Sequence, residues 1–185
     1  MKFFKHSELE GKHAFLSPSK YHWINYSDDK LIDSYKKFKA VQKGTELHEW
    51  ASQCIKLKRK QPEDNDTVNM FVNDAIGYHM ASEQPLKYSD LCFGHADAIS
   101  FRNNILRIHD LKTGEIKAHM YQLEIYAAIF CLEYNVKPSE IQIILRIYQN
   151  GEIIELEPDL DDIVHIMDRI VTGDKLLYAL IEQEK

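Results

Sequence analysis

The feature that most constrains the fold is the alternation of apolar and polar residues between positions 94 and 114. This stretch, GHADAISFRNNILRIHDLKTG, contains two alternating runs on either side of Asn103-Asn104. Asparagine tolerates the positive φ angles of a two-residue hairpin turn, so the stretch predicts two antiparallel strands. Four opposed pairs then share one face of the hairpin: Phe101 with Leu106, Ile99 with Ile108, Asp97 with Asp110, and His95 with Lys112.

The apolar face of this hairpin therefore ends in charged residues. Side chains that are directly opposed have Cβ atoms about 4.5–5.5 Å apart, so the carboxylates of Asp97 and Asp110 repel each other. A divalent cation between them removes the repulsion, and hard oxygen ligands suit Mg²⁺ or Mn²⁺. The alternative is a shifted turn, or an exposed strand end at which both aspartates are solvated.

The remaining patterns predict an α/β (α+β) fold, with a small mixed β-sheet flanked by helices. Helical patterns cover 16–27, 38–60, 66–81, 118–135 and 159–183, and strand patterns cover 85–93, 141–149 and 152–158 in addition to the hairpin. Asn150-Gly151 predicts a tight turn between the last two strands. We expect one domain over 1–185, with a mainly helical part (1–83), a sheet core with a crossing helix (84–157) and a C-terminal helix (158–185).

Composition narrows the class of protein. The chain is 44% hydrophobic and 28% charged, as expected of one globular domain. No apolar run approaches the roughly 20 residues that span a bilayer, and residues 1–13 lack the apolar core of a secretory signal. We therefore expect a cytoplasmic protein with no membrane partner. Cys54, Cys92 and Cys131 form no C-x-x-C pair, which argues against a disulfide framework, a zinc knuckle or an iron–sulfur cluster.

The net charge of −6 argues against a protein that coats nucleic acid non-specifically. Two local basic stretches remain: Lys36, Lys37, Lys39 and Lys43 in the first, and Lys56, Lys58, Arg59 and Lys60 in the second. The second is a candidate DNA contact. Solvated helix faces would explain both stretches equally well.

Three further polar side chains are expected near the charged end of the hairpin. His48 shares a helical stripe with apolar residues, so it points inward, either as a satisfied core histidine or as a metal ligand. Gln122 and Tyr126 are four residues apart and therefore lie on one helix face, which could equally be a polar face of the helix without a role in a site.

Four motifs follow one another along the chain: G-T-x-x-H at 44–48, G-x-x-D-x-I at 94–99, D-x-K-T-G at 110–114, and Q-x-x-x-Y at 122–126. In this order the chain resembles the PD-(D/E)XK nuclease superfamily. The resemblance is closest to its RecB-like branch, which includes phage recombination exonucleases and CRISPR-associated adaptation exonucleases. It implies a restriction-endonuclease-like core, and the strands predicted over 141–158 fit its later part.

The resemblance also implies roles for the matching residues. The metal ligands would be His48, Asp97, Asp110 and the backbone carbonyl of Leu111, holding Mg²⁺ or Mn²⁺. Lys112 would position or activate the attacking water and stabilise the developing phosphorane charge. Gln122 and Tyr126 would orient Lys112 and the DNA strand. The iron–sulfur cysteines of some relatives are missing, so no cluster is expected.

We therefore expect a metal-dependent DNA nuclease. An exonuclease is favoured over an endonuclease because no separate recognition domain is evident, and it would act on DNA ends in recombination, repair or phage DNA metabolism. DNA is the expected partner, and a recombination or replication protein is a further candidate. The alternative is a non-catalytic module of the same fold that binds DNA ends or protein. A zinc protein using His95, His109 and His119 is more distant, because their spacing is irregular.

Overall fold

The structure is a computed structural model that describes residues 15–114 and 118–184. The N-terminal segment considered for a secretory signal, residues 1–13, lies outside the described residues. Two compact units can be distinguished, 1–45 and 46–185, with the boundary inside helix α1 (Asp28–Lys56). The single domain expected from the sequence stays a prediction.

The first unit is helical, as the sequence predicts. The segment expected to be a helix over 16–27 forms a 3₁₀ helix, η2 (Pro18–Asn25), with proline in its first turn. Helix α1 begins at Asp28, ten residues before the predicted start, and Asp28 and Asp29 lie in its first turn, where carboxylates interact favourably with the helix dipole. The ring of Phe15 contacts Tyr35 and Phe38, with centroids 5.2 and 5.4 Å apart.

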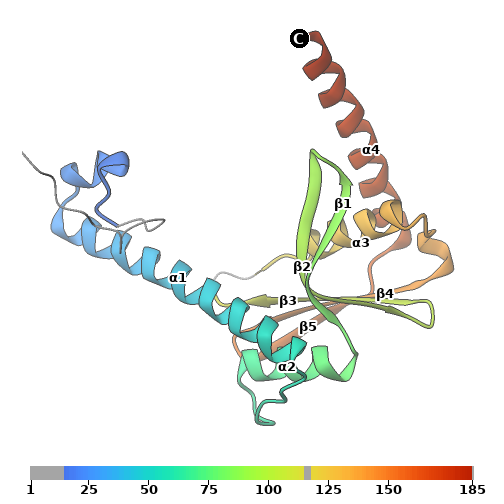
Figure 1. Ribbon diagram of the computed structural model, residues 1–185, viewed down its shortest axis with the longest axis horizontal. Helices are drawn as coiled ribbons and strands as arrows, with labels where there is room; N and C mark the ends of the chain where they lie inside the picture. Colours follow the sequence, from blue (N-terminus) through green and yellow to red (C-terminus); the bar gives the residue numbers. More distant parts are fainter. Residues whose placement is uncertain (1–14, 115–117, 185) are drawn as a thin grey trace, which may run out of the picture. The chain divides into compact units, whose positions relative to one another are not determined.

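The second unit is built on one five-stranded mixed sheet, which confirms the predicted α+β class (Figure 1). Its elements are α2 (Thr67–Gly77), β1 (Ala81–Ser89), β2 (Cys92–Arg102), β3 (Ile105–Lys112), α3 (Tyr121–Glu133), η3 (Pro138–Glu140), β4 (Gln142–Gln149), β5 (Glu152–Leu156) and α4 (Leu160–Gln183). The spatial order is β1-β2-β3-β4-β5. Neighbouring strands are antiparallel except β3 and β4, which are parallel and are joined by the crossover through α3.

Two predicted hairpin turns are confirmed. Asn103 and Asn104 have φ angles of 51° and 59°, and Asn150 and Gly151 have 53° and 75°. Positive φ at both central residues is the geometry of the turn that matches the natural twist of paired strands. The prediction of a single strand over 85–93 is wrong, because β1 ends at Ser89 and β2 starts at Cys92. A strand-forming pattern continues on both sides of Asp90-Leu91, so periodicity does not mark this turn.

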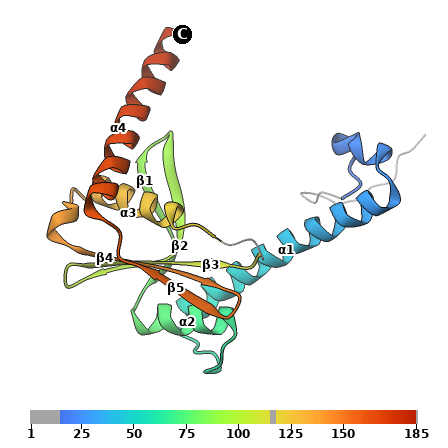
Figure 2. The ribbon, with the colours of Figure 1, turned by 180° about the vertical axis from the view of Figure 1, so that it is seen from behind.

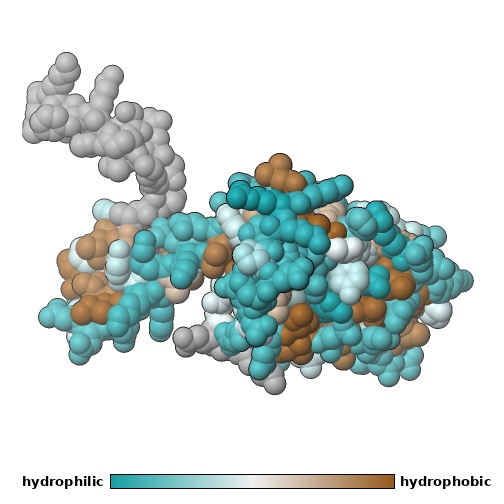
Figure 3. All heavy atoms as spheres, turned by 90° about the horizontal axis from the view of Figure 1, so that it is seen from below, coloured by the Kyte–Doolittle hydropathy of each residue, from teal (hydrophilic) through white to brown (hydrophobic). Residues whose placement is uncertain are grey.

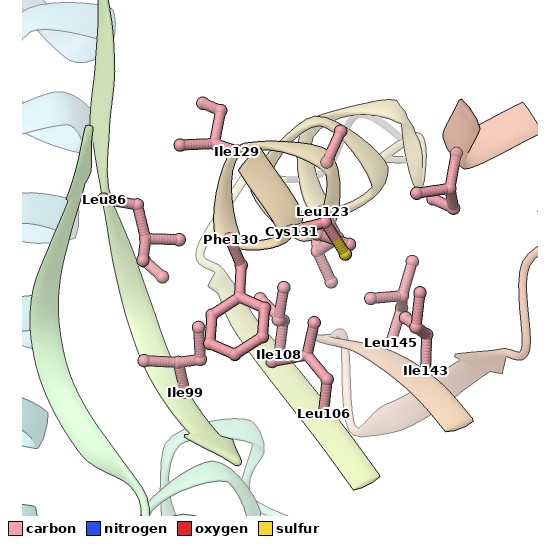
Figure 4. Close-up of a cluster of buried hydrophobic side chains, with 14 of the residues drawn as sticks. Leu86, Ile99, Leu106, Ile108, Leu123, Ile129, Phe130, Cys131, Ile143 and Leu145 are labelled. Carbon is pink, nitrogen blue, oxygen red and sulfur yellow. The ribbon is translucent and has the colours of Figure 1, made fainter. Parts of the chain in front are cut away.

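Helices cover both faces of the sheet, and each face carries its own apolar core (Figure 2). Helices α3 and α4 pack on one face, over a cluster that includes Leu106, Ile108 and Leu145 (Figure 4). Helix α2 and the last turns of α1 pack on the other face, around Phe71, Val72 and Tyr148. Strand β3, in the middle of the sheet, therefore presents successive side chains to two different environments.

Within the described residues, no helix combines the length and the apolar character needed to cross a membrane. Most of the surface drawn in Figure 3 is hydrophilic, with separate apolar patches.

Candidate metal and catalytic centre

The centre forms where strands β2 and β3 separate. Their ladder has the predicted register from Arg102–Ile105 to Ala98–His109 and, among the described residues, ends there. The expected direct cross-strand pairing of Asp97 with Asp110 and of His95 with Lys112 is therefore not found. Instead, the carboxylate of Asp97 lies where the two strands separate, and it accepts a hydrogen bond from the backbone N–H of Leu111 at 2.8 Å. The site is thus a strand fork with a carboxylate at its base.

Strand β1 adds a carboxylate that the sequence analysis missed. Glu83 has a φ of 51° and interrupts the ladder between β1 and β2, which pairs Ser82 with Ala98 and Gln84 with Ala96. This register brings Glu83 beside Asp97. That register depends on the turn at Asp90-Leu91 and on a shift between Lys87 and Ser89, so the prediction of one strand through this turn could not place Glu83.

Three elements converge on a group of potential metal ligands. His48 from α1, Glu83 from β1 and Asp97 from β2 each offer one ligand atom, and these atoms lie within 4.8 Å of one another. Among the described residues this is the one such group of three or more His, Cys, Asp or Glu side chains. The structure thus brings together His48 and Asp97 of the predicted ligand set, whereas Asp110 is not part of the group, and their role as metal ligands stays a prediction. Leu111 contributes its N–H, and its carbonyl as a ligand stays a prediction.

The electrostatics of this group favour an added positive charge. Nδ1 of His48 lies 3.2 Å from Oδ2 of Asp97, and the hydrogen bond with Asp97 raises the pKa of His48 above its ordinary value. Burial and the neighbouring Asp97 raise the pKa of Glu83. A carboxyl whose pKa is raised by another carboxylate is one whose charge is incompletely compensated. Imidazole and carboxylate donors together fit a divalent cation.

Lys112 is held by two side chains. Its ammonium group donates a hydrogen bond to Oδ1 of Asp110 at 3.1 Å and another to Oε1 of Gln122 at 2.8 Å. Asp110 is 3% exposed, and burial together with Asp97 raises its pKa to about 6, although Lys112 acts in the opposite direction. Its Oδ2 lies 2.9 Å from the ammonium but accepts no hydrogen bond from any described residue. The structure thus brings together Asp110, Lys112 and Gln122.

Tyr126 fixes the position of the neighbouring strand. Its hydroxyl donates a hydrogen bond to the carbonyl of His95 at 2.7 Å. Its ring lies so close to Gly94 that a Cβ at that position would be 2.8 Å from Cε1 of the ring. A glycine is therefore needed at position 94 for the ring of Tyr126 to lie this close to the strand.

Two sequence predictions remain, the basic stretch as a DNA contact and the zinc alternative. Lys56 ends α1, and its charge acts on Glu83, whereas Lys58, Arg59 and Lys60 follow in an exposed loop. The zinc alternative is wrong, because His95, His109 and His119 form no ligand group. His109 is fully buried, and its Nδ1 lies 3.2 Å from the hydroxyl of Tyr148.

Comparisons of the chain with protein-family models, with curated proteins and with solved structures found no match.

Proposed function

We propose that this chain is a metal-dependent DNA nuclease with a PD-(D/E)XK-like core. The observation that carries the proposal is the arrangement of one acidic ligand group, His48, Glu83 and Asp97, beside an ammonium group that Asp110 and Gln122 hold in place. Ligands for a divalent cation and an oriented cation of the chain are the two components that phosphodiester hydrolysis requires.

The residues present fit Mg²⁺ or Mn²⁺. His48, Glu83 and Asp97 would hold the ion, and Asp110 offers a buried carboxylate oxygen with an unused hydrogen-bonding capacity. When bound, such an ion neutralises charge on a phosphate and makes a water molecule more acidic.

Lys112 supplies electrostatic stabilisation. Its two hydrogen bonds orient the ammonium group before substrate arrives, so little reorganisation is needed as negative charge develops on the phosphate. Gln122 acts as a positioning residue, because its carboxamide oxygen reaches Lys112 from α3. Tyr126 positions the backbone of β2 at His95, next to the acidic group.

DNA is the substrate that the surrounding charges support. The positive charge of Lys56 acts on Glu83, so a basic side chain lies near the acidic group despite the net negative charge of the chain. Exposed lysine and arginine side chains bind phosphates without reading the sequence. We propose Lys56, Lys58, Arg59 and Lys60 as this track, exonucleolytic action on DNA ends, and a cytoplasmic location.

The test is cleavage of labelled linear and circular DNA, each single- and double-stranded, with Mg²⁺, Mn²⁺ or EDTA. We expect linear DNA to be degraded with either metal and not with EDTA, and circular DNA to resist. The variant Asp97→Asn serves as the control for contaminating nucleases. Binding of DNA ends without cleavage in any of these conditions would contradict the enzyme and favour the non-catalytic module.

A further inference from the structure

An aromatic stripe continues along α3 from the candidate centre. Gln122, Tyr126, Phe130 and Tyr134 are spaced four residues apart, so each lies beside the next along the helix surface, and the row winds about 120° around the axis from first to last. Gln122 bonds to Lys112, and Tyr126 packs against Gly94. From Gln122 to Tyr134 the helix rises about 18 Å, at 1.5 Å per residue. The function proposed above uses only the first two residues of the stripe.

The last two residues of the stripe line an apolar pocket. Its volume is about 350 Å³, and it lies between α3 and the β1–β2 hairpin. The lining includes Gln84, Leu86, Ile99, Phe101, Phe130 and Tyr134. Figure 4 shows Phe130 pointing from α3 toward Ile99 of β2, with Leu86 of β1 close by.

Three aromatic rings shape this pocket. Phe130 is 6% exposed and contacts both Phe101 and Tyr134, with centroids 5.2 and 4.8 Å apart. Phe101 and Tyr134, by contrast, are 41% and 52% exposed. One buried ring thus has two exposed rings beside it. The polar side chain of Gln84 completes the lining, whereas the side chain of Ser100 lies on the opposite face of β2 from Ile99 and Phe101.

We propose that this pocket binds an unpaired base of the DNA strand that enters the candidate centre. The inference rests on the proposed function and names its substrate class as single-stranded or frayed DNA. A flat base stacks on aromatic rings whatever its identity, and its polar edge can bond to the side chain of Gln84. Bases within a duplex have both faces covered by their neighbours, so only an unpaired base can enter.

The stripe explains why the occupant is a base of the same strand. It begins at Gln122, which bonds to Lys112, and ends at Tyr134 in the pocket, so a row of neighbouring side chains along α3 runs from one site to the other. The span of about 18 Å along α3 is long enough for a few nucleotides between the reacting phosphate and the bound base. An apolar side chain of a protein partner is the competing occupant, and the experiment separates the two.

The test uses the full chain in EDTA, where cleavage is stopped, and a single-stranded oligothymidylate that carries one 2-aminopurine. The fluorescence of this base falls when it stacks. The label is moved one nucleotide at a time from the end, and we expect quenching at one or two adjacent positions. Phe101→Ala and Tyr134→Ala should abolish it and weaken binding about five- to a hundredfold, the range for one stacked base. Phe93→Ala, which removes an exposed phenylalanine of β2 outside the pocket, should change neither.

An abasic site at the quenched position provides the matched change in the ligand. It should weaken binding to the unmodified protein and have little further effect on Tyr134→Ala, because both changes remove the same contact. Quenching that persists in Phe101→Ala and Tyr134→Ala would overturn the inference, as would their normal affinity, and the pocket would then suit a protein side chain. If the unmodified protein cleaves DNA while this result is obtained, the proposed function stands and only the base pocket is lost.

Discussion

Two polar clusters each include a residue of strand β3, and they differ in how their buried charges are compensated. The first surrounds His109, next to α2. Oδ2 of Asp74 accepts hydrogen bonds from Arg146 at 2.9 Å and from the hydroxyl of Tyr148 at 2.6 Å, and Nδ1 of His109 lies 3.2 Å from that hydroxyl. Arg146 also bonds to Glu155 at 2.6 Å. Burial lowers the pKa of His109 to about 3, so the imidazole stays neutral. The guanidinium group of Arg146 thus pairs with both carboxylates, and we call Asp74, His109, Arg146, Tyr148 and Glu155 the balanced cluster.

The second cluster begins at the next residue, Asp110. It contains three carboxylates, Glu83, Asp97 and Asp110, of which only Asp110 is paired with a lysine. Burial and Asp97 together raise the pKa values of both Glu83 and Asp110. The carboxylates of the acidic cluster are thus less fully compensated by positive side chains than those of the balanced cluster. Such repulsion costs stability, and it is what we expect of the cation site that we propose.

The largest expected effect comes from removing one carboxylate of the acidic cluster. Asp97→Asn should abolish detectable cleavage, because it removes a charge from the group that would hold the ion. Its amide oxygen can still accept the N–H of Leu111, and less repulsion remains, so the metal-free protein should be as stable as before or more so. Cleavage gels and thermal unfolding in EDTA measure the two effects. Retained cleavage would show that the acidic cluster is not the centre.

The second effect separates chemistry from binding within the acidic cluster. Lys112→Ala should slow cleavage roughly a hundredfold or more, the scale for one preorganised electrostatic group. Metal binding should survive, because a protonated lysine has no lone pair to offer. Single-turnover rates and Mn²⁺ titration are the measurements, with the exposed Lys87→Ala as control. Near-normal turnover, or loss of metal together with activity, would contradict the assigned role.

The balanced cluster should respond in stability. Arg146→Met leaves the carboxylate of Asp74 with the tyrosine hydroxyl alone, which we expect to lower the free energy of unfolding by about 1–3 kcal/mol. Urea unfolding measures the loss. Mn²⁺ affinity should not change, since Arg146 belongs to the balanced cluster. A large fall in metal affinity with normal stability would contradict the separate roles that we assign to the two clusters.

The smallest effect concerns the basic side chains near the acidic cluster. Replacing Lys56, Lys58, Arg59 and Lys60 with alanine should weaken DNA binding evenly across sequences and reduce its salt dependence by about one unit of slope per lost contact. Equivalent replacement of Lys36, Lys37, Lys39 and Lys43 is the matched control. Equal changes in both variants would assign the effect to net charge alone.

Much of this arrangement could be predicted because local rules determine it. The Asn103-Asn104 turn set the β2–β3 register, and helical spacing placed His48, Gln122 and Tyr126 on the correct faces. Local rules did not reveal Glu83, because its position depends on a turn without a strong signal and on a strand irregularity. They also treated Asp97 and Asp110 as a cross-strand pair, whereas the strands separate and Asp97 bonds to the backbone instead. Tertiary packing decides such details.

Direct titration with Mn²⁺ tests the central claim, that the acidic cluster binds a divalent cation and the balanced cluster does not. Isothermal calorimetry should show that the unmodified protein binds Mn²⁺, and that Glu83→Gln and Asp97→Asn each weaken binding at least about tenfold. Asp74→Asn removes a carboxylate from the balanced cluster and should leave the affinity unchanged. Equal Mn²⁺ affinity in all four proteins, or a loss confined to Asp74→Asn, would contradict the account.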